Sequence, residues 1–252
     1  MDYLRQLELL NPKEIKDKEI VLVGAGATGS YIALMLAQLG WGDSARGQGK
    51  LRVFDGDIIE PHNLCNQAYE LSQIGKHKVE ALKELIKRKC GFDIEIYNEM
   101  VDENTNSKLL QGKYVFLLTD TMSSRKEIFE KHLKFSFNTD LIIETRMGLR
   151  DGRVYAFSPS NISHRDEWVN SLYSDEEAEV SRCGASASII TTVMELAAKA
   201  TQRVVHHFYQ NFGQVQQDEK AIIKKPMWNE FHFSLYPESY YCREFGKEPF
   251  LL

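Results

Sequence analysis

The stretch VGAGATGS, residues 23–30, links an apolar run to a segment whose apolar residues have helical spacing. The run is IVLV, and the helical segment begins SYIALM. Between them the glycines follow the pattern Gly-x-Gly-x-x-Gly, and such a turn between a strand and a helix holds phosphates against backbone N–H groups. The stretch therefore predicts that Gly24, Gly26 and Gly29 form a nucleotide-binding turn, and it leaves the nucleotide open.

Downstream of this turn, strand patterns alternate with helix patterns. Apolar or alternating runs predict strands at residues 50–55, 92–97, 113–119, 140–145 and 152–157. Helical spacing predicts helices at residues 75–89 and 185–208, with a helix-compatible segment between residues 97 and 113, and the stretch 228–245 predicts two short strands. This order predicts an α/β fold. The predicted sheet is doubly wound, Rossmann-like and mostly parallel, and antiparallel strands at the C-terminus extend it. Ligands then belong at the carboxyl ends of the strands.

The composition is that of an ordinary globular protein. Of 252 residues, 43% are hydrophobic and 27% are charged, and a formal net charge of -5 gives no electrostatic reason to bind nucleic acid. The 4 cysteines form no Cys-x-x-Cys pair, which favours a reducing cytoplasm over a disulfide framework. No run approaches the roughly 20 apolar residues of a membrane span, and charges stand where a signal peptide would be apolar. We expect one cytoplasmic domain over residues 1–252, with neither nucleic acid nor membrane as a partner.

Asp55 is the first residue that bears on the identity of the nucleotide. It ends the second predicted strand, where an acid can bind a ribose hydroxyl. Its separation from the glycines exceeds the usual ~20 residues, and a turn-rich loop at residues 42–49 accounts for the excess. NAD(P)- and FAD-dependent oxidoreductases share this arrangement with ATP-binding proteins. The glycines and Asp55 alone therefore leave an oxidoreductase open as an alternative.

Five short motifs lie around and beyond Asp55 in a fixed order. They are YLRQ at residues 3–6, DGD at 55–57, NLCNQ at 63–67, GKHK at 75–78 and TD at 119–120, the last followed by Arg125. Together they resemble the signature of the ThiF/MoeB family, which includes the adenylation domains of ubiquitin-activating enzymes. The resemblance covers most of the chain and is weakest over residues 158–182. Five motifs in one order are far more specific than the glycines alone.

The resemblance implies an ATP-dependent adenylyltransferase. Enzymes of this family attack the α-phosphate of ATP with the C-terminal carboxylate of a protein or peptide, which yields an acyl-adenylate and pyrophosphate, so charge must be neutralised on the phosphates. By resemblance, Asp55 would hold the ribose, Lys78 the phosphates and Asp120 a Mg²⁺ ion. The other residues implied to contact ATP are the three glycines of the turn, Asp57, Asn63, Asn66 and Gln67. The acceptor would be a ubiquitin-like protein, a sulfur-carrier protein or a peptide C-terminus.

Two further residues are implied by the family pattern. Arg5, in the N-terminal segment 1–18, would reach as an arginine finger into the site of a second subunit, which implies a symmetric homodimer. Cys183 roughly matches a nucleophilic cysteine of small family members, and it precedes a helical segment whose dipole can lower a thiol pKa; a small buried side chain is the alternative. We expect the polar excursion at residues 158–182 to be a crossover-type loop that guides the acceptor tail.

Several of these residues have other interpretations. Asp120 can instead be the N-cap of the following helix. Asn66 stands where the family has Arg, and an amide brings neither a charge nor a bidentate fork. Either another cation, such as Lys76 or Arg125, substitutes for it, or the site is slow or altered. The paired Cys-x-x-Cys zinc motifs of the family are missing, which indicates a divergent, zinc-free, bacterial-type member. A degenerate member that binds nucleotide without turnover is therefore a second alternative.

Overall fold

The computed structural model of this chain describes residues 18–44, 48–177, 189–212 and 228–251. Two predicted site residues, Arg5 and Cys183, lie outside the described residues. The described α-helices are α3 Ala27–Gln38, α4 Lys78–Cys90, α5 Met122–Ile128, α6 Ile162–Asn170 and α7 Ile190–Phe212. None of the helices in these ranges combines the length and the hydrophobicity needed to cross a membrane.

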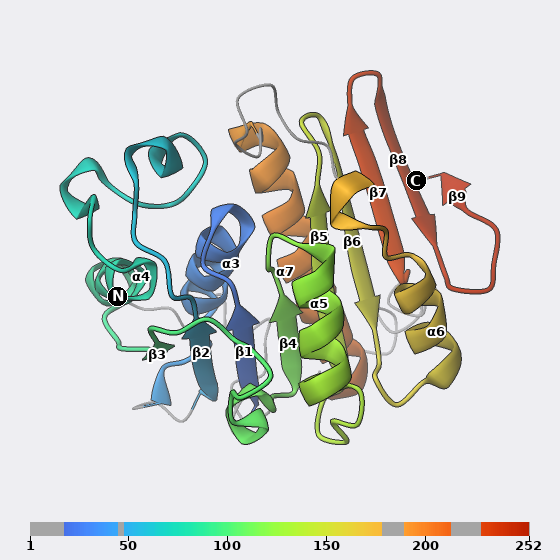
Figure 1. The fold of residues 1–252 in the computed structure, drawn as a ribbon, viewed down its shortest axis with the longest axis horizontal. Coiled ribbons are helices and arrows are strands. Elements are labelled where there is room, and N and C mark those ends of the chain that lie inside the picture. Colours follow the sequence, from blue (N-terminus) through green and yellow to red (C-terminus); the bar gives the residue numbers. More distant parts are fainter. Residues whose placement is uncertain (1–17, 45–47, 178–188, 213–227, 252) are drawn as a thin grey trace.

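One mixed sheet runs through the described chain in the order β3-β2-β1-β4-β5-β6-β7-β8-β9 (Figure 1). Its strands are β1 Glu19–Val23, β2 Lys50–Phe54, β3 Glu95–Tyr97, β4 Tyr114–Leu117, β5 Leu141–Met147, β6 Asp151–Phe157, β7 Glu230–Leu235, β8 Glu238–Arg243 and β9 Phe250–Leu251. The pairs from β3 to β5 are parallel, and those from β5 to β9 are antiparallel. This confirms the predicted fold class.

The helices cover the two faces of the sheet as separate layers. Residues of α3, α4 and α7 pack into one apolar cluster, whereas residues of α5 and α6 pack into the other. Figure 1 shows α5 and α6 in front of the sheet and α7 behind it. Adjacent strands β1 and β4 are therefore followed by helices on opposite faces, α3 after β1 and α5 after β4. The carboxyl ends of these two strands form the switch point of the sheet, where ligands bind in such folds.

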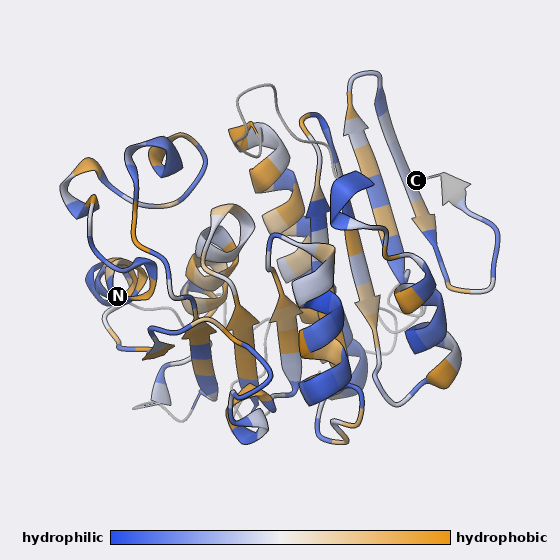
Figure 2. Cartoon of the chain, in the orientation of Figure 1, coloured by the Kyte–Doolittle hydropathy of each residue, from blue (hydrophilic) through white to orange (hydrophobic). Residues whose placement is uncertain are grey.

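The central strands are buried on both faces. In β1 the alternate residues Ile20 and Leu22 enter one cluster, while Val21 and Val23 enter the other, and all four are at most 2% exposed. Figure 2 shows hydrophobic residues concentrated in β1, β2 and β4, with a largely hydrophilic α5 outside them. Each such fully buried aliphatic side chain contributes about 1.5–3 kcal/mol to folding. This packing explains why residues 20–23 of β1 and the whole of β4 read as unbroken apolar runs.

Three segments differ from the sequence prediction. The antiparallel part begins at β6, ahead of the C-terminal strands, because residues 148–150 are too few for a crossover helix. Between β3 and β4 only a short 3₁₀ helix forms, Ser107–Leu110, since the Asp102 carboxylate binds the backbone N–H groups that follow it. The excursion at 158–182 is not a loop throughout. It contains α6, which Asn161 caps by accepting from the His164 amide, and the 3₁₀ turn Asp175–Glu177.

Candidate functional site

A cleft opens at the carboxyl ends of the central strands. It consists of two cavities of about 560 Å³ and about 230 Å³. The two cavities adjoin, because six of their lining residues are shared. The shared residues are Gly26, Asp57, Lys78, Leu118, Thr119 and Asp120. Five of the six belong to motifs that the sequence singled out, and the position matches the edge that the strand order predicts for a ligand.

The three glycines of the turn have different structural roles. Gly24 has a φ of 109°, and a Cβ there would lie 2.7 Å from the Leu118 carbonyl oxygen. A Cβ on Gly29 would lie 2.1 Å from the Gly24 carbonyl oxygen, so both glycines are required by packing. Gly26 differs, because a Cβ there would meet no atom within 4 Å, and this glycine lines both cavities. Of the three, Gly26 is the glycine that leaves room for a ligand.

The beginning of α3 faces this room. Gly26 is the N-cap residue, and it provides no side-chain hydrogen bond to the first turn of the helix. The first turn carries no acidic residue. Uncapped N–H groups and the positive end of a helix dipole stabilise an anion. The local structure therefore suits a phosphate group beside Gly26.

Asp55 is bound to the backbone of the turn. Its carboxylate accepts hydrogen bonds from the Ala25 amide at 2.7 Å and from the Asp57 amide at 2.9 Å. Burial raises the pKa of Asp55, and the two backbone hydrogen bonds and Lys78 oppose that rise. Tyr69 holds the same turn by donating from its hydroxyl to the Ala25 carbonyl at 2.6 Å. Asp55 thus fixes the conformation of the turn, and its predicted contact with a ribose stays a prediction.

Lys78 points into the cleft and is paired there with Asp57. Its ammonium lies 2.7 Å from the Asp57 carboxylate, and the Lys78 amide also donates to the Asp57 carbonyl at 2.9 Å. The side chain of Lys78 is 9% exposed, whereas that of Asp57 is 54% exposed. A lysine on a solvated helix face would be far more exposed, so Lys78 belongs to the cleft wall.

The three amide residues of NLCNQ all line the larger cavity but differ in their hydrogen bonds. The Asn63 carboxamide oxygen accepts from the Glu60 amide at 2.9 Å, which caps the 3₁₀ helix Pro61–Cys65. Asn66 lines the larger cavity. Gln67 also lines it, and its buried Oε1 finds no hydrogen-bond partner in the described part of the chain. Asn63 therefore shapes the segment, and Gln67 offers an open acceptor to a ligand.

Asp120 lies three residues after the end of β4 and lines both cavities. Its side chain is exposed, and no described residue gives it a hydrogen bond or an ion pair. The N-cap of α5 is Thr121, whose hydroxyl accepts from the Ser124 amide at 3.2 Å, so the interpretation of Asp120 as the cap is wrong. Within the described ranges no group of three or more acidic, His or Cys residues could hold a metal. A Mg²⁺ ion at Asp120 would take its other oxygen ligands from phosphate and water.

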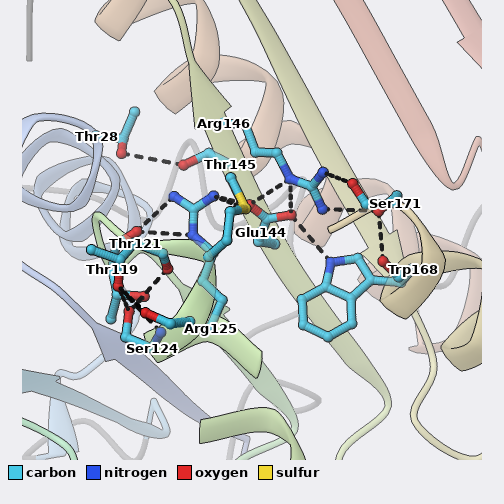
Figure 3. A network of polar contacts seen from close by, with 12 residues as sticks. Thr28, Thr119, Thr121, Ser124, Arg125, Glu144, Thr145, Arg146, Trp168 and Ser171 are labelled. Atoms are coloured by element: carbon cyan, nitrogen blue, oxygen red, sulfur yellow. Dashed lines mark hydrogen bonds and ion pairs between the residues drawn. The ribbon is translucent and has the colours of Figure 1, made fainter. Parts of the chain in front are cut away.

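Sequence reasoning missed a buried ionic network centred on Glu144, drawn in Figure 3. Arg125 donates from Nε and Nη2 to the Thr119 carbonyl oxygen at 2.9 and 2.6 Å, and from Nη1 to Glu144 at 2.6 Å. Glu144 is 0% exposed and also accepts from Arg146 at 2.9 Å and from the Trp168 indole at 3.1 Å. The available signal was a glutamate inside the apolar strand LIIET, where a buried carboxylate needs partners.

The two cations suggested as replacements for the family arginine both have carboxylate partners. Lys76 pairs with Glu84 at 2.8 Å and lines neither cavity, so the structure does not place it in the cleft wall. Arg125 does line the larger cavity, but Thr119 and Glu144 engage it. In the described lining of the two cavities, the permanently cationic side chains are Lys78 and Arg125. The acidic side chains are Asp55, Asp57, Glu60, Glu99 and Asp120. Acidic side chains therefore outnumber basic ones in the described lining of the cleft.

The similarity to known proteins extends along the chain. Residues 3–234 match the sequence pattern that defines the ThiF family. The chain belongs to the ThiF family. The matched residues include those that line the cleft. The resemblance inferred from the five sequence motifs is therefore confirmed.

Two relatives show how much of a longer protein this ThiF-family chain matches. "Ubiquitin-like modifier-activating enzyme 5" of Caenorhabditis elegans is 24% identical over 231 residues, which make up 85% of this chain and 53% of that protein. "Probable molybdopterin-synthase adenylyltransferase" of Porphyra purpurea is 29% identical over 137 residues, which make up 53% of this chain and 34% of that protein. The chain spans about half the length of the first relative and about a third of the second.

A solved structure supports the fold. The crystal structure of E. coli MccB with ATP superimposes with a TM-score of 0.64, covering 99% of this chain and 73% of that chain. The sequence identity is 16%. The likeness at this identity concerns the fold, which the ThiF-family chain shares almost from end to end.

Proposed function

We propose that this chain is an ATP-dependent adenylyltransferase that activates the C-terminal carboxylate of an acceptor as an acyl-adenylate. The observation that carries the proposal is the convergence of Gly26, Lys78 and Asp120 on both cavities of one cleft. An oxidoreductase would account for the glycines and Asp55, but it gives no reason for a lysine and an unpaired carboxylate at the same place. Membership of the ThiF family and the ATP in the MccB structure support the nucleotide.

The residues divide the proposed chemistry between them. The beginning of α3 beside Gly26 would bind a phosphate through backbone N–H groups, and Lys78 would exchange its contact with Asp57 for one with the phosphates. Asp120 offers an oxygen ligand of the kind that Mg²⁺ prefers, so the ion fits here. Bound Mg²⁺ would supply charge neutralisation on the phosphates. Asp55 would hold the ribose while it maintains the turn, and Gln67 would accept a hydrogen bond from the ligand through Oε1.

The acceptor and the assembly are part of the proposal. The names of the two relatives include a ubiquitin-like activating enzyme and a molybdopterin-synthase adenylyltransferase. We therefore propose a ubiquitin-like protein, a sulfur-carrier protein or a peptide C-terminus as the acceptor. Residues 1–252 would act as one adenylation domain in a cytoplasmic homodimer, with Arg5 reaching the partner's site and Cys183 as the candidate nucleophile for a later transfer.

The deciding experiment is a calorimetric titration of ATP with Mg²⁺, and separately of NAD, into wild type and Asp120→Ala. We expect ATP to bind wild type, and to lose most of its Mg²⁺ dependence in the variant because the protein ligand to the ion is removed. The matched control is Glu103→Ala, which removes an exposed acid that lines neither cavity. Binding of NAD without ATP would overturn the proposal in favour of an oxidoreductase.

Turnover is tested separately from binding. Pyrophosphate exchange with small carrier proteins that end in Gly-Gly should appear in wild type and vanish in Asp120→Ala. The second candidate function, a binding protein without turnover, is favoured by Asn66 at the position of the family arginine. ATP binding without exchange, with exchange gained in Asn66→Arg, would support that second function and overturn the first.

A further inference from the structure

We propose that Asp175 is a positioning residue for Asp120. In this view the carboxylate of Asp175 docks the described part of the excursion, residues 158–177, onto the beginning of α5, and this contact keeps Asp120 oriented toward the cleft. The inference rests on the proposed function, because it assigns to Asp175 an effect on the Mg²⁺ dependence of ATP binding.

The contact is long-range in sequence and short in space. The Asp175 carboxylate accepts a hydrogen bond from the Met122 amide at 2.5 Å and a longer one from the Ser123 amide at 3.4 Å. The hydrogen bonds to Ser123 and Met122 lower the pKa of Asp175. The first N–H groups of any helix lack partners within the helix. The hydroxyl of Thr121 accepts from the amide of Ser124, and Asp175 supplies the acceptor for the amides of Met122 and Ser123.

The other side of Asp120 is held by the buried network. The Thr119 carbonyl accepts two hydrogen bonds from Arg125, which Glu144 holds in turn. Only Asp120 and Thr121 lie between this carbonyl and the Met122 amide. The backbone around Asp120 is therefore held on one side by Arg125 of α5, which Glu144 of β5 holds in turn, and on the other side by Asp175 of the excursion.

The two anchors are connected through the excursion, because the buried network also binds a residue close to Asp175 in the chain. Arg146, which binds Glu144, also donates to the Ser171 carbonyl at 2.6 Å and to its hydroxyl at 2.9 Å. Trp168 of α6 donates to the same Glu144. Ser171 lies four residues before Asp175 in the chain. The contacts of α6 and of Asp175 thus both constrain the short segment that contains Asp120. Loss of the Asp175 contact would leave this segment unconstrained at one end.

The test uses Asp175→Ala and Asp175→Asn, with Glu176→Ala as the matched control in the same exposed 3₁₀ turn. ATP affinity is measured with Mg²⁺ and with EDTA, and the ratio of the two affinities is compared between variants. We expect Asp175→Ala to lower this ratio about fivefold, in line with the loss of a helix cap, and to leave the affinity in EDTA unchanged. Asp175→Asn should lower it less, because the amide oxygen still accepts. In an Asp120→Ala background the Asp175 substitution should have no further effect on the ratio.

A second measurement reports on the contact without any nucleotide. Hydrogen exchange of the Met122 and Ser123 amides should accelerate in Asp175→Ala and stay unchanged in Glu176→Ala. Unchanged exchange in Asp175→Ala would overturn the proposal, and so would an unchanged Mg²⁺ ratio in a variant whose amides exchange faster. Wild-type protein that binds no ATP would overturn the proposed function and, with it, the link to Asp120. A different result overturns the Asp175 proposal alone: wild type binds ATP, and the Mg²⁺ dependence of binding is the same in Asp175→Ala as in wild type.

Discussion

The ammonium of Lys78 lies 2.7 Å from the carboxylate of Asp57 inside the cleft, and the backbones of the two residues are hydrogen-bonded as well. The contact orients a nearly buried cation toward the place where a phosphate would bind. A phosphate would have to compete with Asp57 for this cation, so Asp57 sets how tightly Lys78 is held before a ligand arrives.

Lys78→Met is expected to weaken binding of Mg·ATP by about tenfold or more, because a hydrogen bond to a charged group contributes about 1.5–3 kcal/mol. Calorimetric titration measures the change. The matched control is Lys87→Met on the same helix, since Lys87 also pairs with an aspartate at 2.7 Å but lies on the exposed side. Equal affinities of wild type and Lys78→Met would contradict a phosphate role for this lysine.

Gly26→Ala and Gly29→Ala should separate ligand space from packing. Gly26→Ala is expected to keep the melting temperature near that of wild type and to weaken ATP binding, because its Cβ would project into an open part of the cleft. Gly29→Ala should destabilise the fold by at least about 1–3 kcal/mol, since its Cβ would meet the Gly24 carbonyl at 2.1 Å. Thermal melts and titrations on both variants check this. A Gly26→Ala protein that binds ATP as tightly as wild type would argue against a ligand at that position.

Glu144→Gln should be strongly destabilising, by about 3–5 kcal/mol, because it leaves two buried guanidinium groups without their carboxylate. Urea unfolding at neutral pH measures the loss. The comparison is Glu84→Gln, which removes an exposed partner of Lys76 and should cost at most about 1 kcal/mol. Similar losses in the two variants would mean that the buried network contributes no more than a surface pair.

The stability of the protein should fall between pH 7 and pH 5 because of His207. Burial lowers the pKa of His207 to about 4, below the ordinary value of 6.5. Between pH 7 and pH 5 the unfolded chain takes up a proton on His207, whereas the folded chain does not. Protonation therefore favours the unfolded chain, and the free energy of unfolding decreases as the pH falls. The expected loss from this group is about 2 kcal/mol between pH 7 and pH 5. Urea unfolding at both pH values should show a smaller difference in His207→Gln, and an identical difference would exclude His207 as the cause.

The sequence predicted the order of the central elements and the edge of the sheet where the cleft lies. It did so because parallel strands buried on both faces leave unbroken apolar runs, and because motif residues follow the strands directly. It did not reveal the structural work of Asn63 and Asp55, since a capping side chain and a ligand-binding one have the same residue types.

The network around Glu144 shows a second kind of limit. Its partners come from residues 119–125, from β5 and from α6, and no local pattern connects segments so far apart. The early start of the antiparallel strands was missed for a different reason. Strand patterns carry little information about direction, and only the short link at residues 148–150 indicates the hairpin.

The opposite placement of α3 and α5 has a consequence for how binding can change in this fold. Because the two helices leave neighbouring strands toward different faces, the opening between them follows from the path of the backbone, which Gly24, Gly29 and Asp55 maintain at the turn. Substitutions at Gly26, Lys78 or Asp120 would then alter which molecule is held while the hollow itself persists. The capacity to bind is a property of the connectivity, and the choice of ligand is a property of a few replaceable residues.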